Sequence, residues 1–199
     1  MSEHKEQFKA LEDAVVAGDR EAATGLTGQL LEAGVDPLAI IEGGLVPGMA
    51  IIGERFKKNE VFVPEMLVAA RAMKESMAML EPKLVESGYK PDHTVVVGTV
   101  EGDLHDIGKN LVATMLKGAN FAVVDLGTNV PPEKFLEAAV EHGAKLIGLS
   151  ALLTTTMPSM KGTIEAIRAA GAADIRVMIG GAPVTEQFAA EIGAAGYAP

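Results

Sequence analysis

Cysteine and tryptophan do not occur in this sequence of 199 residues, and tyrosine and phenylalanine are scarce, with two and six copies. The absence of cysteine excludes disulfides, thiolate nucleophiles and cysteine-bound iron–sulfur clusters. It fits a reducing, cytoplasmic setting. The first six residues are polar and lack the apolar core of a signal peptide, which agrees with the same expectation.

Basic runs are also missing, and the formal net charge is −10. A chain with this charge repels a phosphate backbone, and so few aromatic side chains offer little surface for base stacking. Charges or glycines interrupt every apolar run before it reaches the roughly 18 residues of a membrane span. The sequence therefore predicts a protein that binds neither nucleic acid nor membrane.

The first part of the chain, to about residue 86, carries apolar residues at helical spacing. Asp19 and Asp36 stand where N-caps of the second and third helices are expected, and Gly43-Gly44 and Pro47 should bend or break the third. Short links between four amphipathic helices indicate a four-helix bundle, which we place at residues 1–88. The four apolar stripes are Phe8, Leu11 and Val15; Ala23, Leu26 and Leu30; Leu38, Ile41, Leu45, Met49, Ile52 and Phe56; and Met66, Ala70, Met73, Met77 and Leu80.

The second part, residues 89–199, follows a linker around residues 86–92 and alternates strands with helices. This alternation predicts a five-stranded, doubly wound parallel sheet of the flavodoxin or Rossmann-like type, with helices on both faces. The fold class is thus α/β with an all-α N-terminal domain. The expected strands are 94–99, 121–126, 146–150, 176–179 and 196–198, and the expected helices are 108–119, 132–142, 158–170 and 185–192.

Ligands of such sheets bind at the carboxyl ends of the strands, where the strand order reverses. In the flavodoxin-like order this point lies between the first and third strands. The adjacent segments are Val100–Gly108, Ser150–Met157 and Gly180-Gly181. These three segments also hold the most unusual side chains of this half, so we expect the functional site there.

The first segment contains the triplet Asp103-x-His105. A histidine whose second ring nitrogen donates to a carboxylate is a common metal ligand, because the carboxylate fixes the tautomer and raises the basicity of the imidazole. The alternative is that Asp106 caps the next helix and His105 is a solvated loop residue. A hard-cation site at Asp103 and Asp106 is a further alternative, but it leaves His105 without a role.

The other two segments are rich in hydroxyls and glycine. Thr154, Thr155 and Thr156 could donate to Asp103 or to a polar ligand, or simply form turns and caps. Gly180-Gly181 permits a bulky group to lie against the backbone, but it equally permits a plain tight turn.

Taken together, these motifs resemble the cobalamin-binding signature shared by methionine synthase and the corrinoid-dependent mutases. The matching pattern is Asp103-x-His105-x-x-Gly108, Ser150-x-Leu152 and Gly180-Gly181. The resemblance implies a corrinoid cofactor whose cobalt takes His105 as its lower axial ligand. It also implies a relay from His105 to Asp103 and on to Thr156, where methionine synthase has a serine.

The remaining site residues follow from the same resemblance. It places one group beside the corrin ring and another around the nucleotide tail of the cofactor. The first group is Gly102, Leu104, Asp106, Ile107 and Gly108; the second is Ser150, Leu152, Thr154, Gly180 and Gly181.

Residues 48–66 resemble the helical cap that covers the methyl face of cobalt in methionine synthase. The positions that shield the methyl group fall on Phe56 and Val63. Phe56 also continues a helical core stripe, which needs no cofactor. A hinge that lets this cap move aside is expected near Lys90-Pro91-Asp92.

Over its whole length the chain looks like the small corrinoid proteins of anaerobic methyltransferase systems that serve methylamines, methanol, glycine betaine or methoxyaromatics. The resemblance implies a carrier that cycles between Co(I) and methyl-Co(III). Its expected partners are a substrate:corrinoid methyltransferase, a second methyltransferase acting on tetrahydrofolate or a thiol, and a reductive activation protein. Such a carrier works with the catalysts of its partners, so whether it is itself an enzyme stays open.

Two other classes of protein remain as alternatives. One is a cobalamin-binding sensor or regulatory module, although the basic segment typical of DNA-binding sensors is missing. The other is a signalling domain without cobalamin, in which Asp103 or Asp106 accepts a phosphoryl group. Members of the resembling family usually continue into a further helix beyond the position of Pro199, so a shortened chain is also open.

Overall fold

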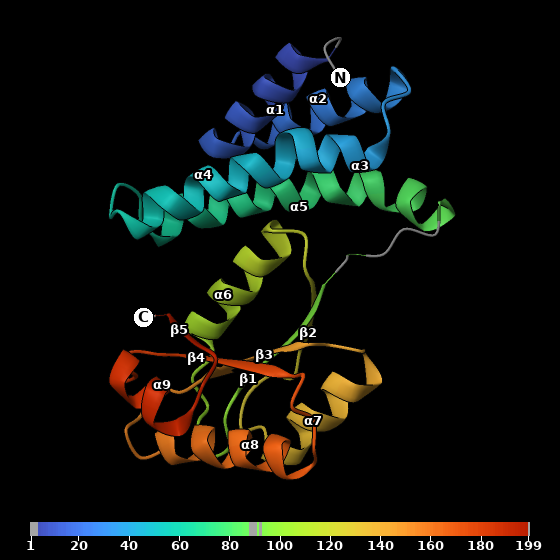
Figure 1. The fold of residues 1–199 in the computed structure, drawn as a ribbon. Coiled ribbons are helices and arrows are strands. Elements are labelled where there is room, and N and C mark those ends of the chain that lie inside the picture. The colour runs from blue at the N-terminus through green and yellow to red at the C-terminus, as the bar shows by residue number, and fades with distance from the viewer. Residues whose placement is uncertain (1–3, 88–90, 92, 199) are drawn as a thin grey trace. The chain divides into compact units, whose positions relative to one another are not determined.

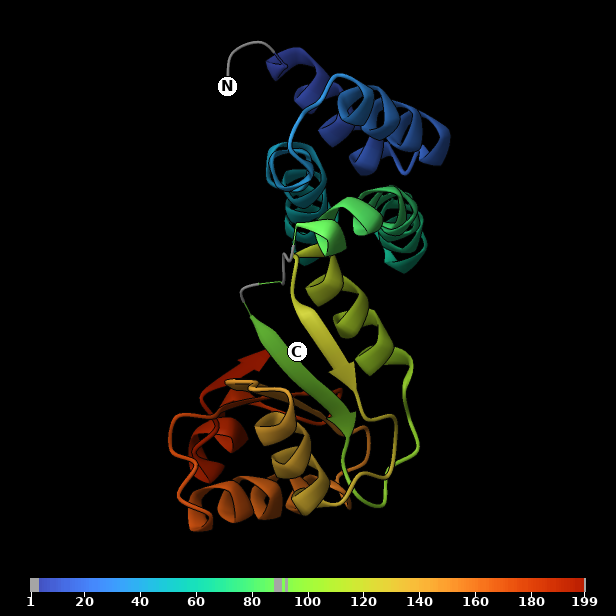
Figure 2. The same cartoon turned by 90° about the vertical axis from the view of Figure 1, so that its right-hand side faces the viewer.

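The computed structural model describes residues 4–87, 91 and 93–198. The chain divides into two compact units, drawn from two directions in Figures 1 and 2. One unit comprises residues 1–90 together with 114–120, and the other comprises residues 91–113 together with 121–199. Lys90 and Asp92 lie outside the described residues, so the hinge expected there stays a prediction.

The first unit is built from helical rods, as the apolar stripes predict. Asp19 accepts a hydrogen bond from the amide of Ala22 and Asp36 from that of Leu38, so both act as N-caps. The elements are α1 (Lys5–Ala17), α2 (Arg20–Glu32), α3 (Pro37–Ile40), the π-helix η1 (Ile41–Leu45), α4 (Val46–Lys57) and α5 (Val63–Glu86). Since α3, η1 and α4 follow one another without a break, the described part of the unit has the four expected rods.

The third rod is not broken at Gly43-Gly44 and Pro47. Instead, the backbone widens to π-helical hydrogen bonding over η1 and returns to α-helix at Val46. Proline lacks an N–H group, and a local π-helical turn lets the ladder shift where that donor is missing. A stretch that helical rules mark as a break is therefore a continuous helix.

This rod, Pro37–Lys57, is also long and apolar enough to cross a membrane by length and composition alone. Uninterrupted apolar runs do not indicate this helix, because glycines and charges interrupt its sequence. Its apolar side chains are those of a core helix, because Ile40, Leu45 and Ile52 are almost completely buried within the helical unit. Core helices of globular proteins share the composition of a membrane span.

The second unit is the predicted sheet with its helices. Its elements are β1 (Thr94–Thr99), α6 (Ile107–Gly118), β2 (Ala122–Asp125), α7 (Pro132–Glu141), β3 (Leu146–Ser150), α8 (Met157–Ala169), β4 (Arg176–Gly180), α9 (Glu186–Ile192) and β5 (Gly196–Ala198). All strand pairs are parallel, in the order β2-β1-β3-β4-β5. This is the flavodoxin-like order, and the expected reversal between β1 and β3 is confirmed.

The two faces of the sheet are covered unequally. Helices α7, α8 and α9 lie together on one face, and α6 lies on the other (Figure 1). Alternation along β4 reflects this, since Val177 and Ile179 are buried in the core while Met178 is 39% exposed. Phe135, Ile147 and other apolar side chains fill the core on the side of α7, α8 and α9.

The register of the central strands brings their carboxyl ends level with one another. Thr99 pairs with Ser150, and Ser150 pairs with Gly180. Hydrogen bonds beyond the strands extend this line, from the amide of Val100 to the carbonyl of Ser150 and from Ala151 to Gly180. The loops that follow β1, β3 and β4 therefore start side by side at one edge of the sheet.

Candidate functional site

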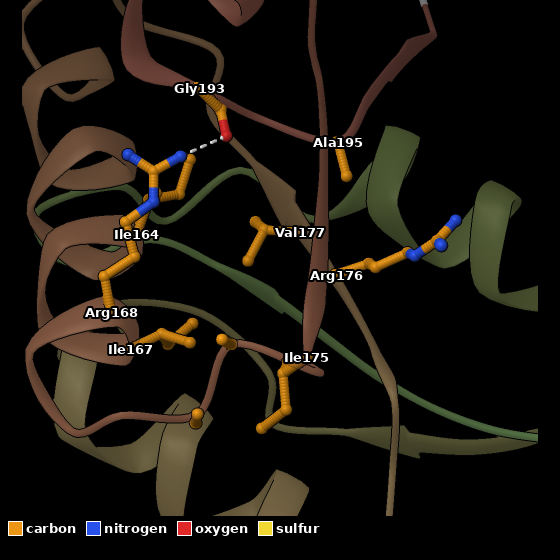
Figure 3. A pocket seen from close by; sticks show the side chains of 10 residues that line it. Ile164, Ile167, Arg168, Ile175, Arg176, Val177, Gly193 and Ala195 are labelled. Atoms are coloured by element: carbon orange, nitrogen blue, oxygen red, sulfur yellow. Dashed lines mark hydrogen bonds between the residues drawn. The ribbon is translucent and has the colours of Figure 1, made fainter.

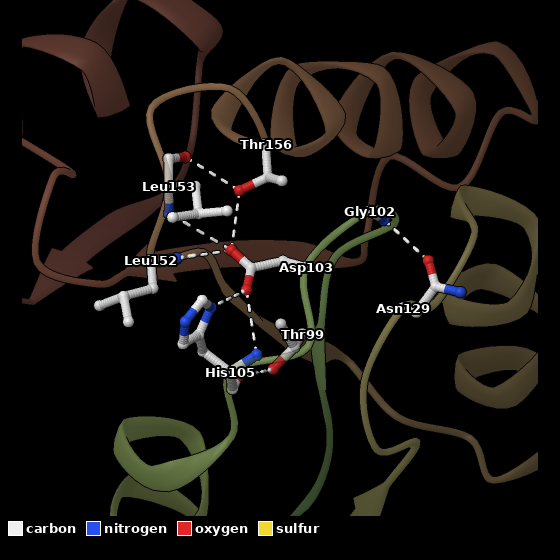
Figure 4. Close-up of polar contacts among 8 residues, drawn as sticks. All are labelled: Thr99, Gly102, Asp103, His105, Asn129, Leu152, Leu153 and Thr156. Atoms are coloured by element: carbon white, nitrogen blue, oxygen red, sulfur yellow. Dashed lines mark hydrogen bonds and ion pairs between the residues drawn. The ribbon is translucent and has the colours of Figure 1, made fainter.

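The carboxylate of Asp103 is the centre of the polar network at this edge (Figure 4). The residue is fully buried, at 0% exposure. One oxygen, Oδ1, accepts from the amide of His105 at 3.0 Å and from its ring nitrogen Nδ1 at 2.7 Å. The other, Oδ2, accepts from the amides of Leu152 at 2.7 Å and Leu153 at 3.3 Å, and the hydroxyl of Thr156 lies 2.8 Å away.

These donors decide the ionisation of the buried carboxyl. Burial by itself raises the pKa of Asp103, because a low dielectric disfavours the charged form. The backbone amides of His105 and Leu152, the imidazole and the Thr156 hydroxyl stabilise the carboxylate by more, so the pKa of Asp103 lies well below its usual range. At neutral pH the site therefore holds a buried negative charge.

The imidazole of His105 is fixed on one side and accessible on the other. With an ionised carboxylate 2.7 Å from Nδ1, that nitrogen carries the proton and donates. The ring nitrogen Nε2 points away from Asp103 (Figure 4), and the side chain is 51% exposed. The second ring nitrogen therefore lies on the open side, where a ligand could reach it.

The hydroxyl of Thr156 lies within reach of two acceptors. It is 2.8 Å from Oδ2 of Asp103 and 2.9 Å from the carbonyl of Leu153, so its one proton is shared between them. The side chain is 6% exposed. Thr154 and Thr155 are exposed, so of the three neighbouring hydroxyls Thr156 alone is buried against the carboxylate.

Several apolar side chains near the site are exposed. Leu104 is 73% exposed and Ile107 is 83% exposed, on the two sides of His105 in the chain. Leu152 and Leu153, whose amides hold Asp103, are 43% and 42% exposed. Exposed apolar side chains of this kind are compatible with an apolar ligand at this edge.

The other expected site residues lie at the same edge. Asp106, Gly108 and Thr154 are exposed, whereas Ser150, Gly180 and Gly181 are half-buried at strand ends. Gly102 has a φ of 84°, and the carbonyl oxygen of Ala151 lies 1.9 Å from where a Cβ of Gly181 would be, so side chains are disfavoured at both positions. Gly181 is thus required by the close approach of the Ala151 backbone.

Phe56 and Val63 belong to the helical unit, at the end of α4 and the start of α5. Phe56 is half-buried and Val63 is 38% exposed. Next to them Phe62 is 63% exposed. Their part in covering a cofactor stays a prediction.

The motifs did not reveal several residues that hold the His105 loop. Thr99 is buried and donates its hydroxyl proton to the carbonyl of His105 at 2.8 Å. Asn129, after β2, accepts from the amide of Gly102 at 2.8 Å through its side-chain oxygen. The buried Lys109 binds Asp125. The rule that ligand sites form at carboxyl strand ends points to Asn129, because β2 lies next to β1.

Another hollow of the sheet unit, about 250 Å³ in volume, lies at the opposite, amino edge of β4 and β5 (Figure 3). Its lining is mostly apolar, and the guanidinium of Arg168 at its side already donates to the carbonyl of Gly193 at 2.7 Å. A set of convergent polar groups comparable to that around Asp103 is missing from this lining, so the His105 edge is the better candidate.

The geometry also bears on the alternative chemistries. Asp103 is an unsuitable phosphoryl acceptor, because it is buried and both of its oxygens are engaged. Among the described residues, no group of three or more histidine or acidic side chains is arranged to hold a metal ion by itself.

Comparison with known proteins agrees with this geometry. Two family models described as B12 binding domains match, one over residues 93–199 and the other over residues 7–81. Trimethylamine corrinoid protein 1 of Methanosarcina acetivorans is 42% identical, covering 98% of this chain and 91% of its own length.

Solved structures give the same result. A cobalamin-binding protein from Desulfitobacterium hafniense superimposes with a TM-score of 0.82 at 32% identity, covering 96% of this chain and 91% of the other. The methanol:cobalamin methyltransferase complex MtaBC from Methanosarcina barkeri matches with a TM-score of 0.83 at 31% identity, covering 97% and 74%. The chain therefore belongs to the corrinoid protein family with B12-binding domains.

Proposed function

We propose that this protein carries a methyl group on the cobalt of a bound corrinoid. It takes the group from a substrate:corrinoid methyltransferase and delivers it to a second methyltransferase acting on tetrahydrofolate or a thiol. The observation that carries the proposal is the imidazole of His105, held by a buried carboxylate 2.7 Å away and open on its other side. A reductive activation protein, an anaerobic system and a cytoplasmic location are further parts of the proposal.

The residues present fit a corrinoid. His105 would be the lower axial ligand, and the exposed side chains of Leu104 and Ile107 would lie beside the ring. Ser150, together with the bare backbone at Gly180 and Gly181, would line the groove for the nucleotide tail. When bound, the corrinoid supplies a cobalt nucleophile that accepts a methyl group and releases it to an acceptor.

Asp103 and Thr156 act on that centre through His105. The carboxylate keeps the Nδ1 proton in place, so that Nε2 is the nitrogen left free to bind. The Thr156 hydroxyl and the amide of Leu152 hold the carboxylate itself. Because its pKa is depressed, Asp103 stays ionised beside His105 at neutral pH.

The names of the relatives support the methyl-transfer part of the proposal. They include proteins named for trimethylamine and dimethylamine, and a solved complex named for methanol. Donor chemistry thus differs among proteins that this chain resembles at similar levels. The donor of this chain is therefore left open by these names.

Anaerobic reconstitution with hydroxocobalamin tests the proposal most directly. After gel filtration, the protein should retain corrin absorbance in about a one-to-one ratio, as one lower ligand per chain requires. With cobinamide, which has no base of its own, His105→Ala should lose the spectrum of nitrogen-ligated cobalt, because the imidazole is gone. His142→Ala, which removes an exposed histidine at the end of α7, is the matched control and should bind as the parent does. A colourless parent protein would end the proposal.

Methyl transfer is tested with a partner methyltransferase and a labelled methyl donor. The loaded protein should take up label and pass it to tetrahydrofolate or a thiol when the second methyltransferase is added. A sensor would behave differently: it would retain the corrin but change oligomeric state between dark and light without transferring label. That outcome would replace the carrier by the regulatory alternative.

A further inference from the structure

We infer that the connection between β2 and α7 positions the His105 loop from both of its ends, through Asn129 at one end and the Asp125–Lys109 ion pair at the other. The inference rests on the proposed role of His105 as a cobalt ligand. Neither anchor belongs to the motifs that assign the cofactor. Both are positioning residues, since they contact the loop and not the exposed side of the imidazole.

The first anchor is reciprocal. Asn129 accepts from the amide of Gly102 through its side-chain oxygen at 2.8 Å, and its own amide donates to the carbonyl of Asp103 at 2.9 Å. Figure 4 shows its side chain approaching the Gly102 turn from the opposite side to Thr156. Asn129 has a φ of 54°, a left-handed conformation that asparagine tolerates better than most residues. The turn that aims Asp103 at the imidazole is thus held by two bonds from one residue.

The second anchor is an ion pair at the start of α6 between the buried Lys109 and Asp125, whose side chain is 34% exposed. The side chain of Lys109 is 4% exposed, and its ammonium group lies 2.6 Å from each carboxylate oxygen of Asp125, which ends β2. A lysine is rarely buried unless it is paired. Such a pair adds little net stability but does favour one arrangement over others. It fixes the first turn of α6, four residues after His105.

The two anchors are coupled through the backbone between them. The carboxylate of Asp125 accepts from the amide of Gly127 at 2.9 Å, and the carbonyl of Gly127 accepts from Thr99 at 2.9 Å. Val130 then donates to the carbonyl of Thr99 at 3.0 Å. The connection therefore runs along the end of β1 and contacts the chain on both sides of His105, at Gly102 and Asp103 before it and at Lys109 after it. The position of the imidazole therefore depends on these contacts as well as on Asp103.

Variants at Asn129 distinguish the contribution of its side chain from that of its backbone. Asn129→Gly keeps the left-handed backbone and the amide donor but removes the acceptor for Gly102. Asn129→Asp keeps an acceptor of the same shape and should rescue. In the apo-protein, hydrogen exchange at the Gly102 amide should quicken about tenfold in Asn129→Gly, as expected for one lost hydrogen bond, and return in Asn129→Asp.

A second measurement on the apo-protein reports the tautomer of the His105 imidazole. Nitrogen chemical shifts should show His105 in the Nδ1–H tautomer in the parent and a larger share of Nε2–H in Asn129→Gly. Lys109→Met and the milder Asp125→Asn should shift the tautomer in the same direction. Lys134→Met, which removes an exposed lysine paired with Glu137 on α7, is the control and should leave the tautomer unchanged. A merely structural role would lower stability without moving this ratio.

The loaded protein gives the functional readout. Cobinamide, which has no base of its own, is bound and reduced to the Co(II) state, so that a nitrogen splitting in the electron paramagnetic resonance spectrum can come only from the protein. The share of nitrogen-split signal should fall in Asn129→Gly and Lys109→Met and recover in Asn129→Asp. If all variants match the parent in tautomer and splitting, the inference is wrong while the proposed function stands. If the parent itself shows no splitting, the proposed function fails. The apo tautomer ratios then still decide whether Asn129 and the Asp125–Lys109 pair position His105.

Discussion

At the scale of single residues, the site depends on one buried charge. Asp103 receives its donors from two loops, so the carboxylate joins the loop after β1 to the loop after β3. A buried carboxylate without such donors would take up a proton. The depressed pKa of Asp103 and the fixed tautomer of His105 are therefore two results of the same set of hydrogen bonds.

Substitution of Asp103 should change how stability depends on pH. Because the pKa of Asp103 is lower in the folded protein than in the unfolded chain, the carboxylate contributes stability that is fully present above about pH 5 and is lost as the pH falls. Asp103→Asn should lose roughly 2–3 kcal/mol at pH 7 and show a flatter decline between about pH 5 and 3. Denaturant unfolding of the apo-protein at several pH values measures this. Asp106→Asn, at an exposed carboxylate beside the same histidine, should keep the decline of the parent.

The hydroxyl of Thr156 gives a second prediction at this scale. Thr156→Val keeps the shape but removes the donor to Oδ2, and a hydrogen bond to a charged acceptor is worth about 1.5–3 kcal/mol. We expect Thr156→Val to lower the free energy of unfolding by about that amount and Thr156→Ser to restore most of it. A Thr156→Val protein as stable as Thr156→Ser would show that the hydroxyl adds no net stability, either through the carboxylate or through Leu153.

Whether the sequence predicts a contact of this site depends on whether a side chain or the backbone makes it. Asp103 and His105 could be placed near the three hydroxyls because their loops follow strands whose order was predictable, and the resemblance selected Thr156 among them. The hydrogen bonds made by the amide of Leu153 and by the side chain of Asn129 could not be predicted. Backbone donors carry no residue signature, and Asn129 acts through a left-handed turn that no pattern specifies.

At the scale of helices and strands, periodicity predicted the elements well and their ends less well. β1, β3 and β5 have the bounds expected, since β-branched or apolar runs end at glycine or at polar loops. β2 is shorter than expected and starts at Ala122, after Phe121. The third helix was expected with a bend or break at Gly43-Gly44 and Pro47, and it continues instead through η1. Propensity rules treat each glycine and proline separately, whereas packing against α1 decides whether the helix continues.

Glycines in the helical unit give a prediction that contrasts packing with propensity. A Cβ on Gly48 of α4 would lie 2.7 Å from the Cβ of Val15 and 3.0 Å from the carbonyl oxygen of Glu12. Gly48→Ala should therefore lower the stability of the helical unit by about 1–3 kcal/mol despite the better helix propensity of alanine. Gly25 of α2 has no neighbour within 4 Å of its would-be Cβ, so Gly25→Ala should stabilise by about 0.5–1 kcal/mol. Opposite signs in thermal unfolding would confirm that α1 and α4 meet through Gly48.

At the scale of the whole molecule, the residues proposed for one cofactor come from two compact units. The sheet unit contains the lower-ligand side of the proposed site, with His105, Asp103 and Thr156. The helical unit carries Phe56 and Val63, which are proposed to cover the upper side. Family models match both parts, so the pairing of a helical unit with a sheet unit is itself a family property.

Hydrogen exchange over the full chain, with and without hydroxocobalamin, tests whether both units contact the cofactor. A ligand present at 100 times its dissociation constant slows exchange through opening of its own unit by about a hundredfold. Protection should be strongest in the loops after β1, β3 and β4. If Phe56 and Val63 cover the corrin, the end of α4 and the start of α5 should be protected as well, while α2 changes less. In Phe56→Ala this second protection should weaken, while protection around His105 persists. Protection confined to the sheet unit would contradict the cap assignment and leave the lower-ligand assignment intact, because the two depend on different units.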